Sequence, residues 1–166
     1  MKLNHLFAAS LLIVMISCKS KTAFDYSEAI VKMEAELSTD IASADQKVSE
    51  YLEAKEKDNA ILMSREMELL AEEKLKEIKD MKAPDVEEAD NFKKAAIRYF
   101  SYVKSIYSSF KKYTMAATDQ EKEAERKKLS KIIAEKKIIT EHMKEAQRKF
   151  AAANDFYIGK VNGGEQ

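Results

Sequence analysis

Cys18 is the residue of this sequence whose chemistry is most specific. It is the only cysteine in the chain, so no disulfide forms within one molecule. A structural zinc site needs about four Cys and His ligands, and a c-type haem needs a Cys-x-x-Cys-His motif. The chain has neither. An ordinary free cysteine and a covalently modified one remain as alternatives, and the place of Cys18 just after an apolar segment, residues 6–16, favours modification.

The segment before Cys18 has the features of a removable secretion signal. Lys2 precedes it, and it is shorter than the roughly 20 apolar residues that span a bilayer. Residues 15–18, Met-Ile-Ser-Cys, resemble the lipobox of bacterial lipoprotein signals, with methionine in place of the usual leucine. The resemblance implies that residues 1–17 are removed and that Cys18 carries acyl chains such as palmitate. Two or more such chains anchor a protein stably to a membrane.

Residues 18–22 are expected to form a short tether between the anchor and the first helix. Lys19 and Lys21 lie in this tether and can each gain about 1 kcal/mol near anionic headgroups; the alternative is a solvated tether. By the rules known for such lipoproteins, an aspartate after the cysteine favours the inner membrane and an acidic run directs export to the surface. The tether has neither, so we expect an outer-membrane anchor facing the periplasm, with surface exposure as the alternative.

His142 is the only histidine after residue 17, and it lacks the surroundings of a metal site. A di-iron bundle needs Glu-x-x-His on two helices, whereas the residue three before His142 is Ile139. Met63, Met67 and Met115 could gather at one end of a bundle and bind copper, but methionine more often fills a core. We therefore predict no metal and no cofactor.

No other pattern indicates an enzyme or a nucleic-acid-binding protein. The sequence has no phosphate-binding glycine loop, and no nucleophile stands out beside a base. Charged residues make up 35% of the chain, yet its formal net charge is +0, so it has no basic footprint for nucleic acid. The lysines over residues 127–137 have acids interspersed near them, at Glu123, Glu125 and Glu135, which favours a solvated face.

Aromatic residues gather in the segment 86–117. Tyr99 belongs to its regular apolar series, Phe100 and Tyr107 flank that series on one side, and Tyr102 flanks it on the other. One interpretation is a wide core stripe with tyrosine hydroxyls reaching water. The other is a tyrosine-lined groove for an apolar ligand or a partner. We take these four residues as the candidate ligand or partner surface.

The spacing of apolar residues predicts an all-α protein. Pro84 is the only proline, and all three glycines follow residue 158, so the breaks they cause are confined to boundaries. Between residues 23 and 158 apolar residues recur at alternating steps of four and three, as in helices packed along a seam. The series has one extra-residue step near Ile41 and is weakest over residues 61–81. Lys136 interrupts the last series, and we expect its stem to lie along apolar surface while its ammonium reaches water.

We predict four long helices, at residues 23–56, 59–82, 86–117 and 119–158. Short connections make neighbouring helices antiparallel, which gives an antiparallel up-down-up-down four-helix bundle. Residues 159–166 are predicted to be a flexible tail. A single long bent helix across residues 56–59 is the alternative at the first turn.

Capping residues support these boundaries. Asp85 with Glu88 is expected to cap the third helix, and Thr118 with Glu121 to form a capping box for the fourth. Asp58 is the cap expected for the second helix.

The bundle end nearest the anchor is expected to hold an apolar cluster. Its predicted members are Phe24, Tyr26, Val86, Phe92, Phe150, Phe156 and Tyr157. Acidic side chains outnumber basic ones over residues 25–82, and the reverse holds over residues 85–158. We therefore expect the two helical hairpins to attract one another.

Several short segments resemble one protein family. They are Cys18, residues 26–31 (Tyr-Ser-Glu-Ala-Ile-Val), the turn at residues 83–84, and residues 146–151 (Ala-Gln-Arg-Lys-Phe-Ala) with Asn154 and Phe156 behind them. The chain is similar to uncharacterised helical surface lipoproteins of leptospiral type, also frequent in Bacteroidetes. The resemblance implies a helical envelope lipoprotein and supplies no catalytic residues.

Three functions follow from these features. The first is a non-enzymatic envelope lipoprotein, bound to the membrane by its lipid, whose helical surface binds or scaffolds another envelope protein. The second is a periplasmic carrier or sensor with an apolar ligand in the bundle core, which the surplus of tyrosine and methionine favours. The third is a hydrolase that uses scattered carboxylates.

Overall fold

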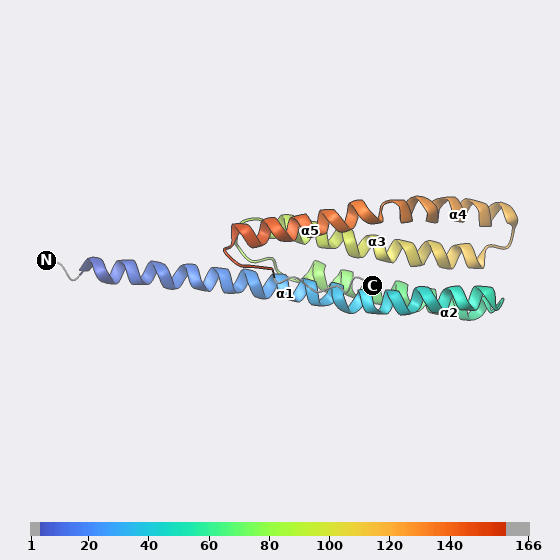
Figure 1. The fold of residues 1–166 in the computed structure, drawn as a ribbon, viewed down its shortest axis with the longest axis horizontal. Coiled ribbons are helices and arrows are strands. Elements are labelled where there is room, and N and C mark those ends of the chain that lie inside the picture. The colour runs from blue at the N-terminus through green and yellow to red at the C-terminus, as the bar shows by residue number, and fades with distance from the viewer. Residues whose placement is uncertain (1–3, 159–166) are drawn as a thin grey trace.

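The computed structural model describes the backbone of residues 4–158 and the side chains of residues 19–158. The predicted flexible tail, residues 159–166, lies outside the described residues, as does the side chain of Cys18. The described chain is all-α, as predicted, and contains no strand. Its helices are α1 (Asn4–Glu53), α2 (Lys57–Asp80), α3 (Ala89–Met115), α4 (Asp119–Ala134) and α5 (Lys136–Ala153) (Figure 1).

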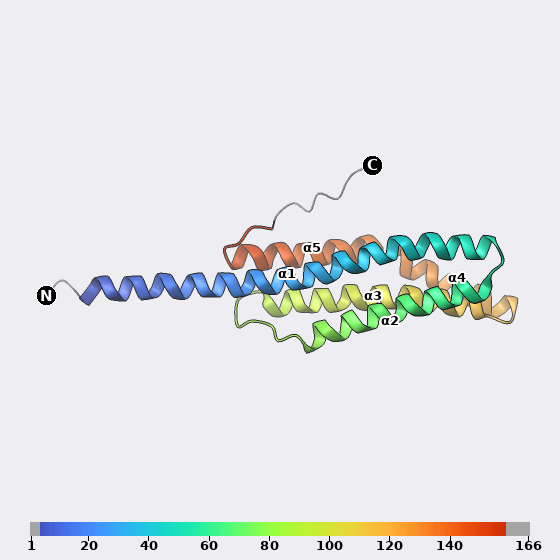
Figure 2. The same cartoon turned by 90° about the horizontal axis from the view of Figure 1, so that it is seen from below.

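The helices lie side by side along one long axis (Figures 1 and 2). α3 is central, because it packs against α2, α4 and α5, while α1 packs against α2 and α5. The turns at residues 54–56 and 116–118 lie at one end of the molecule, which we call the distal end. The connection at residues 81–88 lies at the other, proximal end, where the N-terminal part of α1 projects beyond the other helices.

α1 is longer than predicted. We expected the first helix to begin at residue 23, but α1 runs without a break from Asn4 to Glu53 and includes the predicted tether, residues 18–22. No proline or glycine occurs before Pro84, so nothing in the backbone chemistry ends the helix there. A helical tether spans about 1.5 Å per residue, whereas an extended tether spans about 3.3–3.6 Å per residue. The tether at residues 18–22 is therefore shorter as a helix than it would be as an extended chain. The removal of residues 1–17 stays a prediction.

None of the helices in the part that the structure describes is both long enough and apolar enough to cross a membrane.

A true turn separates α1 from α2, so a single long bent helix across residues 56–59 is wrong. Lys55 has a positive φ of 64°, and the backbone N–H of Glu56 donates to the carbonyl of Tyr51 at 2.7 Å. Asp58 is not the cap of α2, because the N-cap is Glu56, without a side-chain bond. Asp58 lies in the first turn, where its charge favours the positive end of the helix dipole.

The two remaining caps had different outcomes. Asp85 does not cap α3: the connection extends to Glu88, the N-cap, which has a φ of 62° and makes no side-chain cap bond. The capping box of α4 is confirmed, because the N–H of Glu121 donates to Thr118 Oγ1 at 3.2 Å and the N–H of Thr118 donates to Glu121 Oε2 at 3.2 Å.

The predicted fourth helix, residues 119–158, is two helices. It breaks at Glu135, whose N–H donates to the carbonyl of Ile132 at 3.1 Å, three residues back. Lys136, the residue that interrupts the apolar series, is exposed. Because a lysine ammonium is costly to bury, the chain breaks where the seam would have required it to face the core. α5 then ends at Ala153, so residues 154–158 are not helical.

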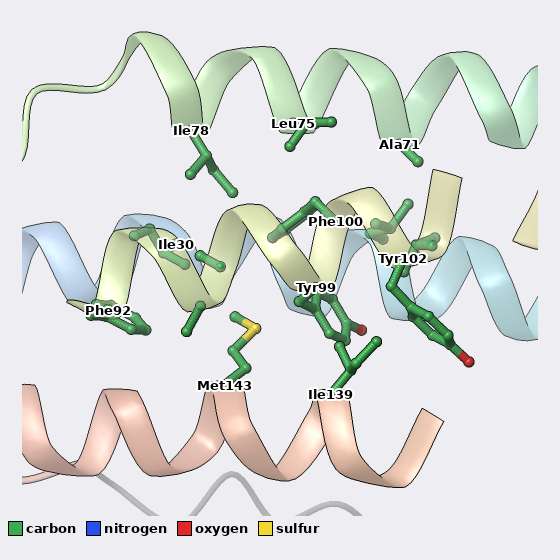
Figure 3. Close-up of a cluster of buried hydrophobic side chains, with 14 of the residues drawn as sticks. Ile30, Ala71, Leu75, Ile78, Phe92, Tyr99, Phe100, Tyr102, Ile139 and Met143 are labelled. Atoms are coloured by element: carbon green, nitrogen blue, oxygen red, sulfur yellow. The ribbon is translucent and has the colours of Figure 1, made fainter. Parts of the chain in front are cut away.

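The core surrounds α3 along its length. Figure 3 shows α2 side chains on one side of α3 and α5 side chains on the other. Its labelled members include Ile78, Leu75, Phe92, Phe100, Ile139 and Met143, all buried. The buried apolar side chains of the described region run from Ala23 to Ala151. A chain that begins at residue 18 therefore keeps this whole core.

An aromatic cluster closes the proximal end, as predicted. Phe92 and Phe150 stack with ring centroids 5.4 Å apart, and Tyr26 meets both rings edge-on. The ring of Phe156 contacts the rings of both Phe150 and Phe24, and the ring centroids are 5.7 Å apart in each of these two pairs. Val86 is half-buried against the core. The prediction was wrong for Tyr157, which is 95% exposed because the chain has left the helix before this residue.

Ion pairs join the two halves of the chain. Lys104 of α3 meets Glu72 of α2 at 2.7 Å, and Lys111 of α3 pairs with Glu68 of α2. In both ion pairs the basic residue belongs to the second half of the chain and the acidic residue to the first half. Such pairs near the surface are worth about 0–1 kcal/mol each, so they orient helices that the apolar core holds together.

Thr118→Ala is expected to lower the free energy of unfolding by about 1 kcal/mol, because it removes the oxygen that caps α4. Urea unfolding followed by circular dichroism measures this. Thr39→Ala is the matched control, since Thr39 lies exposed within α1 and bonds only the Ala35 carbonyl. It should leave stability unchanged or raise it slightly. Equal losses in both variants would contradict a specific role for the cap.

Candidate ligand site

An apolar pocket of about 400 Å³ lies between α1, α3 and the α4–α5 junction in the distal half of the molecule. This volume is within the range of roughly 300–1,000 Å³ typical of small-molecule sites. The lining residues of α1 are Ile41, Asp45, Val48, Ser49 and Leu52. Those of α3 are Tyr99, Tyr102, Val103, Ile106, Tyr107 and Phe110. Those of α4 and α5 are Leu129, Ile133, Lys136 and Thr140.

The break at Glu135 accounts for the position of this pocket. α5 packs against α1 on the proximal side of the break, whereas α4 and α1 form no extended contact among the described residues. α4 stays beside α3 and diverges from α1 (Figures 1 and 2). Leu129 is the only buried residue of α4. The pocket therefore lies next to the break, where α4 diverges from α1.

The structure brings three of the four candidate residues to the pocket. Tyr99 and Tyr102 are 7% exposed and Tyr107 is 3% exposed, and all three line it. Phe100 is fully buried and does not line it. Its ring meets that of Tyr99 edge-on at 5.4 Å, within the core (Figure 3). The four residues thus form no exposed patch, because all four are buried and three of them line the pocket. Binding of a ligand or partner by these residues stays a prediction.

Two tyrosine hydroxyls that meet the pocket have partners on α1. The hydroxyl of Tyr107 donates to Asp45 Oδ1 at 2.8 Å, and that of Tyr99 donates to Glu34 Oε1 at 3.3 Å. The hydroxyl of Tyr102 is buried and has no hydrogen-bond partner. Figure 3 shows it pointing away from α3 toward the side on which α5 lies. Buried polar groups are rarely left unpaired. The Tyr102 hydroxyl is therefore an exception among the tyrosine hydroxyls of the pocket lining.

All three hydroxyls stay protonated at neutral pH. Burial raises the pKa of Tyr99 to about 12, and the carboxylate of Glu34 adds to the rise. Burial and then the hydrogen bond to Asp45 raise the pKa of Tyr107. Burial raises the pKa of Tyr102 as well, with contributions from the charges of Glu135 and Asp45. The pocket therefore presents neutral phenols.

Polar side chains are more frequent at one end of the pocket than at the other, although Ile41 lies at the more polar end and Ser49 lies between Val48 and Leu52. Asp45, Tyr102, Lys136 and Thr140 lie toward the α4–α5 junction. The residues closest to the distal turns are apolar: Leu52 ends its side of α1, Phe110 its side of α3, and Leu129 its side of α4. The lining is therefore graded from more polar to more apolar and has no sharp division.

No direct signal in the sequence indicated the α1 and α4 walls of the pocket. Val48 and Leu129 are ordinary members of an apolar series, and Asp45 is one acid among many. Lys136 was the one irregularity in that part of the apolar series, but its long side chain could also have been accommodated in a continuous helix, so it did not predict the break.

Other candidate chemistry is weaker. His142 is exposed, and Met67 is buried whereas Met115 is 61% exposed, so these methionines do not share one environment. Among the side chains that the structure describes, no group of three or more His, Cys, Asp or Glu could hold a metal ion. A larger hollow of about 570 Å³ between α2, α3 and α4 is lined by polar residues that include Ser101, Ser105 and Ser108, and Tyr102 lies between the two hollows.

Stability is expected to fall as pH rises from about 10 to about 12. Tyr26 and Tyr99 hold their protons to about 12 in the folded chain, whereas tyrosine in an unfolded chain ionises near 10. The unfolded state therefore loses protons first, and alkali favours it by about 1 kcal/mol per pH unit for each such tyrosine. Denaturant unfolding over this range measures the slope.

Tyr99→Phe should reduce that slope, and Tyr157→Phe is the control, because Tyr157 is 95% exposed. An unchanged slope in Tyr99→Phe would show that this buried phenol does not control the alkaline response.

No family model, curated protein or solved structure matches this chain. The resemblance to helical surface lipoproteins therefore stays a prediction.

Proposed function

We propose that this protein is a non-enzymatic bacterial envelope lipoprotein whose helical domain is a binding module for an apolar ligand. The observation that carries the proposal is the pocket between α1, α3 and α4, which is apolar, of ligand size and lined by three buried tyrosines. The absence of a nucleophile beside a base in the sequence supports a binding role. A carrier or sensor is the form of binding that this geometry favours.

The proposed architecture is an antiparallel up-down-up-down four-helix bundle in which α4 and α5 are one interrupted fourth helix. The alternation of the chain turns between the two ends supports it, as do the contacts of α3 with α2, α4 and α5. The interruption gives the bundle a tightly packed proximal half and a distal half that is open on one side.

The proposed anchor is Cys18, after removal of residues 1–17, in the outer membrane with the domain facing the periplasm. The lipobox resemblance and the acid-free residues 19–22 support this placement. Along a helical α1, the first pocket residue, Ile41, lies roughly 35 Å from Cys18 at 1.5 Å per residue. The pocket would therefore sit in the aqueous space and not in the headgroups.

A second candidate function is docking of another envelope protein. Leu62 and Leu69 of α2 are each 54% exposed and lie seven residues apart, so they share one face of the helix. Exposed apolar side chains that share a face can mark an interaction surface. Capture of one specific envelope protein by the intact chain, lost in Leu62→Glu and Leu69→Glu, would favour scaffolding over ligand carriage.

Cys18→Ser is expected to move the protein out of the membrane fraction, or to leave it unprocessed, without changing its helical fold. Detergent phase partitioning and metabolic labelling with palmitate measure the anchor, and circular dichroism measures the fold. Among the described side chains, the apolar core members begin at Ala23, so loss of helicity would mean that Cys18 has a structural role. Unchanged partitioning would disprove the lipid anchor.

Ile133→Trp is expected to fill the pocket mouth and to abolish binding of an apolar fluorescent probe such as N-phenylnaphthylamine. Ile133 is 51% exposed and lines the pocket, so a larger side chain there has room outside the core. Ile138→Trp is the matched control, because Ile138 is 65% exposed on the other side of the α4–α5 break and does not line the pocket. Equal probe binding by both variants, or none by the original protein, would refute the proposed site.

A further inference from the structure

We propose that the proximal end of the domain makes a second membrane contact, in which exposed apolar side chains enter the headgroup region of a zwitterionic phospholipid bilayer and hold the helices upright. These side chains are Phe24 of α1 and Phe156, Tyr157 and Ile158, which follow α5, and we call them the proximal patch. The inference rests on the proposed lipid anchor at Cys18 and adds a protein surface to it. Exposure, height above the anchor and charge carry it.

The first observation is that the proximal patch is contiguous and open to solvent. Tyr157 is 95% exposed, Phe24 is 43% exposed and Ile158 is 37% exposed. All four side chains of the patch line one hollow of about 150 Å³, and the rings of Phe24 and Phe156 meet edge-on at 5.7 Å. Exposed apolar side chains that gather in one place mark a surface that a partner or a membrane covers.

The backbone after α5 holds these side chains in place. Asn154 Nδ2 donates to the carbonyl of Glu87 at 2.9 Å, and the N–H of Phe156 donates to the carbonyl of Ala151 at 3.2 Å. Asp155, between them, has a positive φ of 56°, and the chain crosses here from α5 toward α1 (Figure 1). The fold therefore fixes the exposed side chains that follow at the proximal end.

The second observation is the height of the patch above the anchor. Because α1 is unbroken from Asn4 to Glu53, Phe24 lies about 9 Å from Cys18 along the helix at 1.5 Å per residue. Side chains of a helix tilt toward its N-terminus, which here is the end that carries the anchor. The headgroups add roughly 5–8 Å to each side of the hydrocarbon core. A patch at this height therefore meets the headgroup region.

The third observation is the balance of charge around the patch. Lys19 and Lys21 precede it on α1, whereas Asp25, Glu28 and Asp155 adjoin it in the sequence, and all five are exposed. The two signs nearly cancel, so an anionic bilayer has no advantage over a zwitterionic one. The apolar side chains must therefore supply the contact. Tyrosine is enriched at bilayer interfaces because its ring is apolar and its hydroxyl reaches water.

Two other occupants fit the patch less well. Residues 159–166 follow it directly, but Val161 is the only apolar residue among their glycines and polar residues. A second copy of the chain would have to bury on the order of 1,000 Å², whereas the patch consists of four side chains. A bilayer needs no such area, because the anchor already holds the patch at the membrane surface.

The test uses tryptophan fluorescence, because the chain contains no tryptophan of its own. The lipidated protein is placed in phosphatidylcholine vesicles with or without bromine on the acyl chains near the headgroups, since bromine quenches tryptophan at contact. Three variants are compared: Tyr157→Trp in the patch, Lys82→Trp at the same end, and Met115→Trp at the distal end. Lys82 is a matched position, because it is exposed and shares a hollow with Lys19.

We expect Tyr157→Trp to lose about half of its emission in brominated vesicles, because its ring would lie at the interface. Lys82→Trp and Met115→Trp should each lose several-fold less. Flotation of the vesicles shows in each case that the protein is anchored.

A charged variant tests whether the patch makes the contact. Ile158→Asp, combined with Tyr157→Trp, should reduce the quenching to the level of Lys82→Trp, because a carboxylate opposes entry into the interface. Ile138→Asp in the same background is the control. Ile138 is 65% exposed near the start of α5, whereas the patch follows the end of that helix. It should leave the quenching unchanged, and circular dichroism checks that all variants are folded.

The outcomes separate this contact from the anchor on which it rests. A chain that does not float with the vesicles would overturn the anchor, and the contact with it. Unquenched Tyr157→Trp in a floating chain would overturn the contact and leave the anchor, and a blue-shifted emission without quenching would mean that residues 159–166 or a second copy cover the patch. Equal quenching in Lys82→Trp would mean that the anchor alone brings this end to the bilayer. Strong quenching in Met115→Trp would overturn the upright orientation.

Discussion

A lysine at a core position of the fourth helical segment is the constraint on which the open half of this molecule depends. A helix that packs along a seam must turn the same face inward at every step, and the series from Leu129 onward assigns Lys136 to that face. An ammonium costs too much to bury without a partner. The structure resolves the conflict at Glu135, where the helix breaks and Lys136 stays exposed.

The break divides the molecule into halves with different packing. On the proximal side, α5 contacts α1 and α3, and the rings of Phe92 and Phe150 stack at 5.4 Å with Tyr26 against both. On the distal side, α4 keeps only Leu129 buried. α3 packs against α2, α4 and α5, so it needs an apolar stripe wide enough to include Phe100, Tyr102 and Tyr107.

Helix type, the central aromatic stripe and the capping box at Thr118 could be predicted because each depends on neighbouring residues in the sequence. Helix ends at Asp58 and Asp85 were mispredicted, since an acid near a helix start serves equally well as a cap or in the first turn. The pocket was only half predictable. Its tyrosine wall stands out on α3, but the facing wall on α1 consists of residues that resemble any other core series.

A ligand in the pocket would supply the contacts that α4 lacks. Few buried side chains hold α4 in place, and regions with little burial are the first to open locally. A chain of hydrocarbon between Val48 of α1, Phe110 of α3 and Leu129 of α4 would bury apolar surface on all three helices at once. Because such a ligand binds only the folded arrangement, it would stabilise that arrangement. Under the proposed function, a bound ligand would therefore stabilise the observed position of α4.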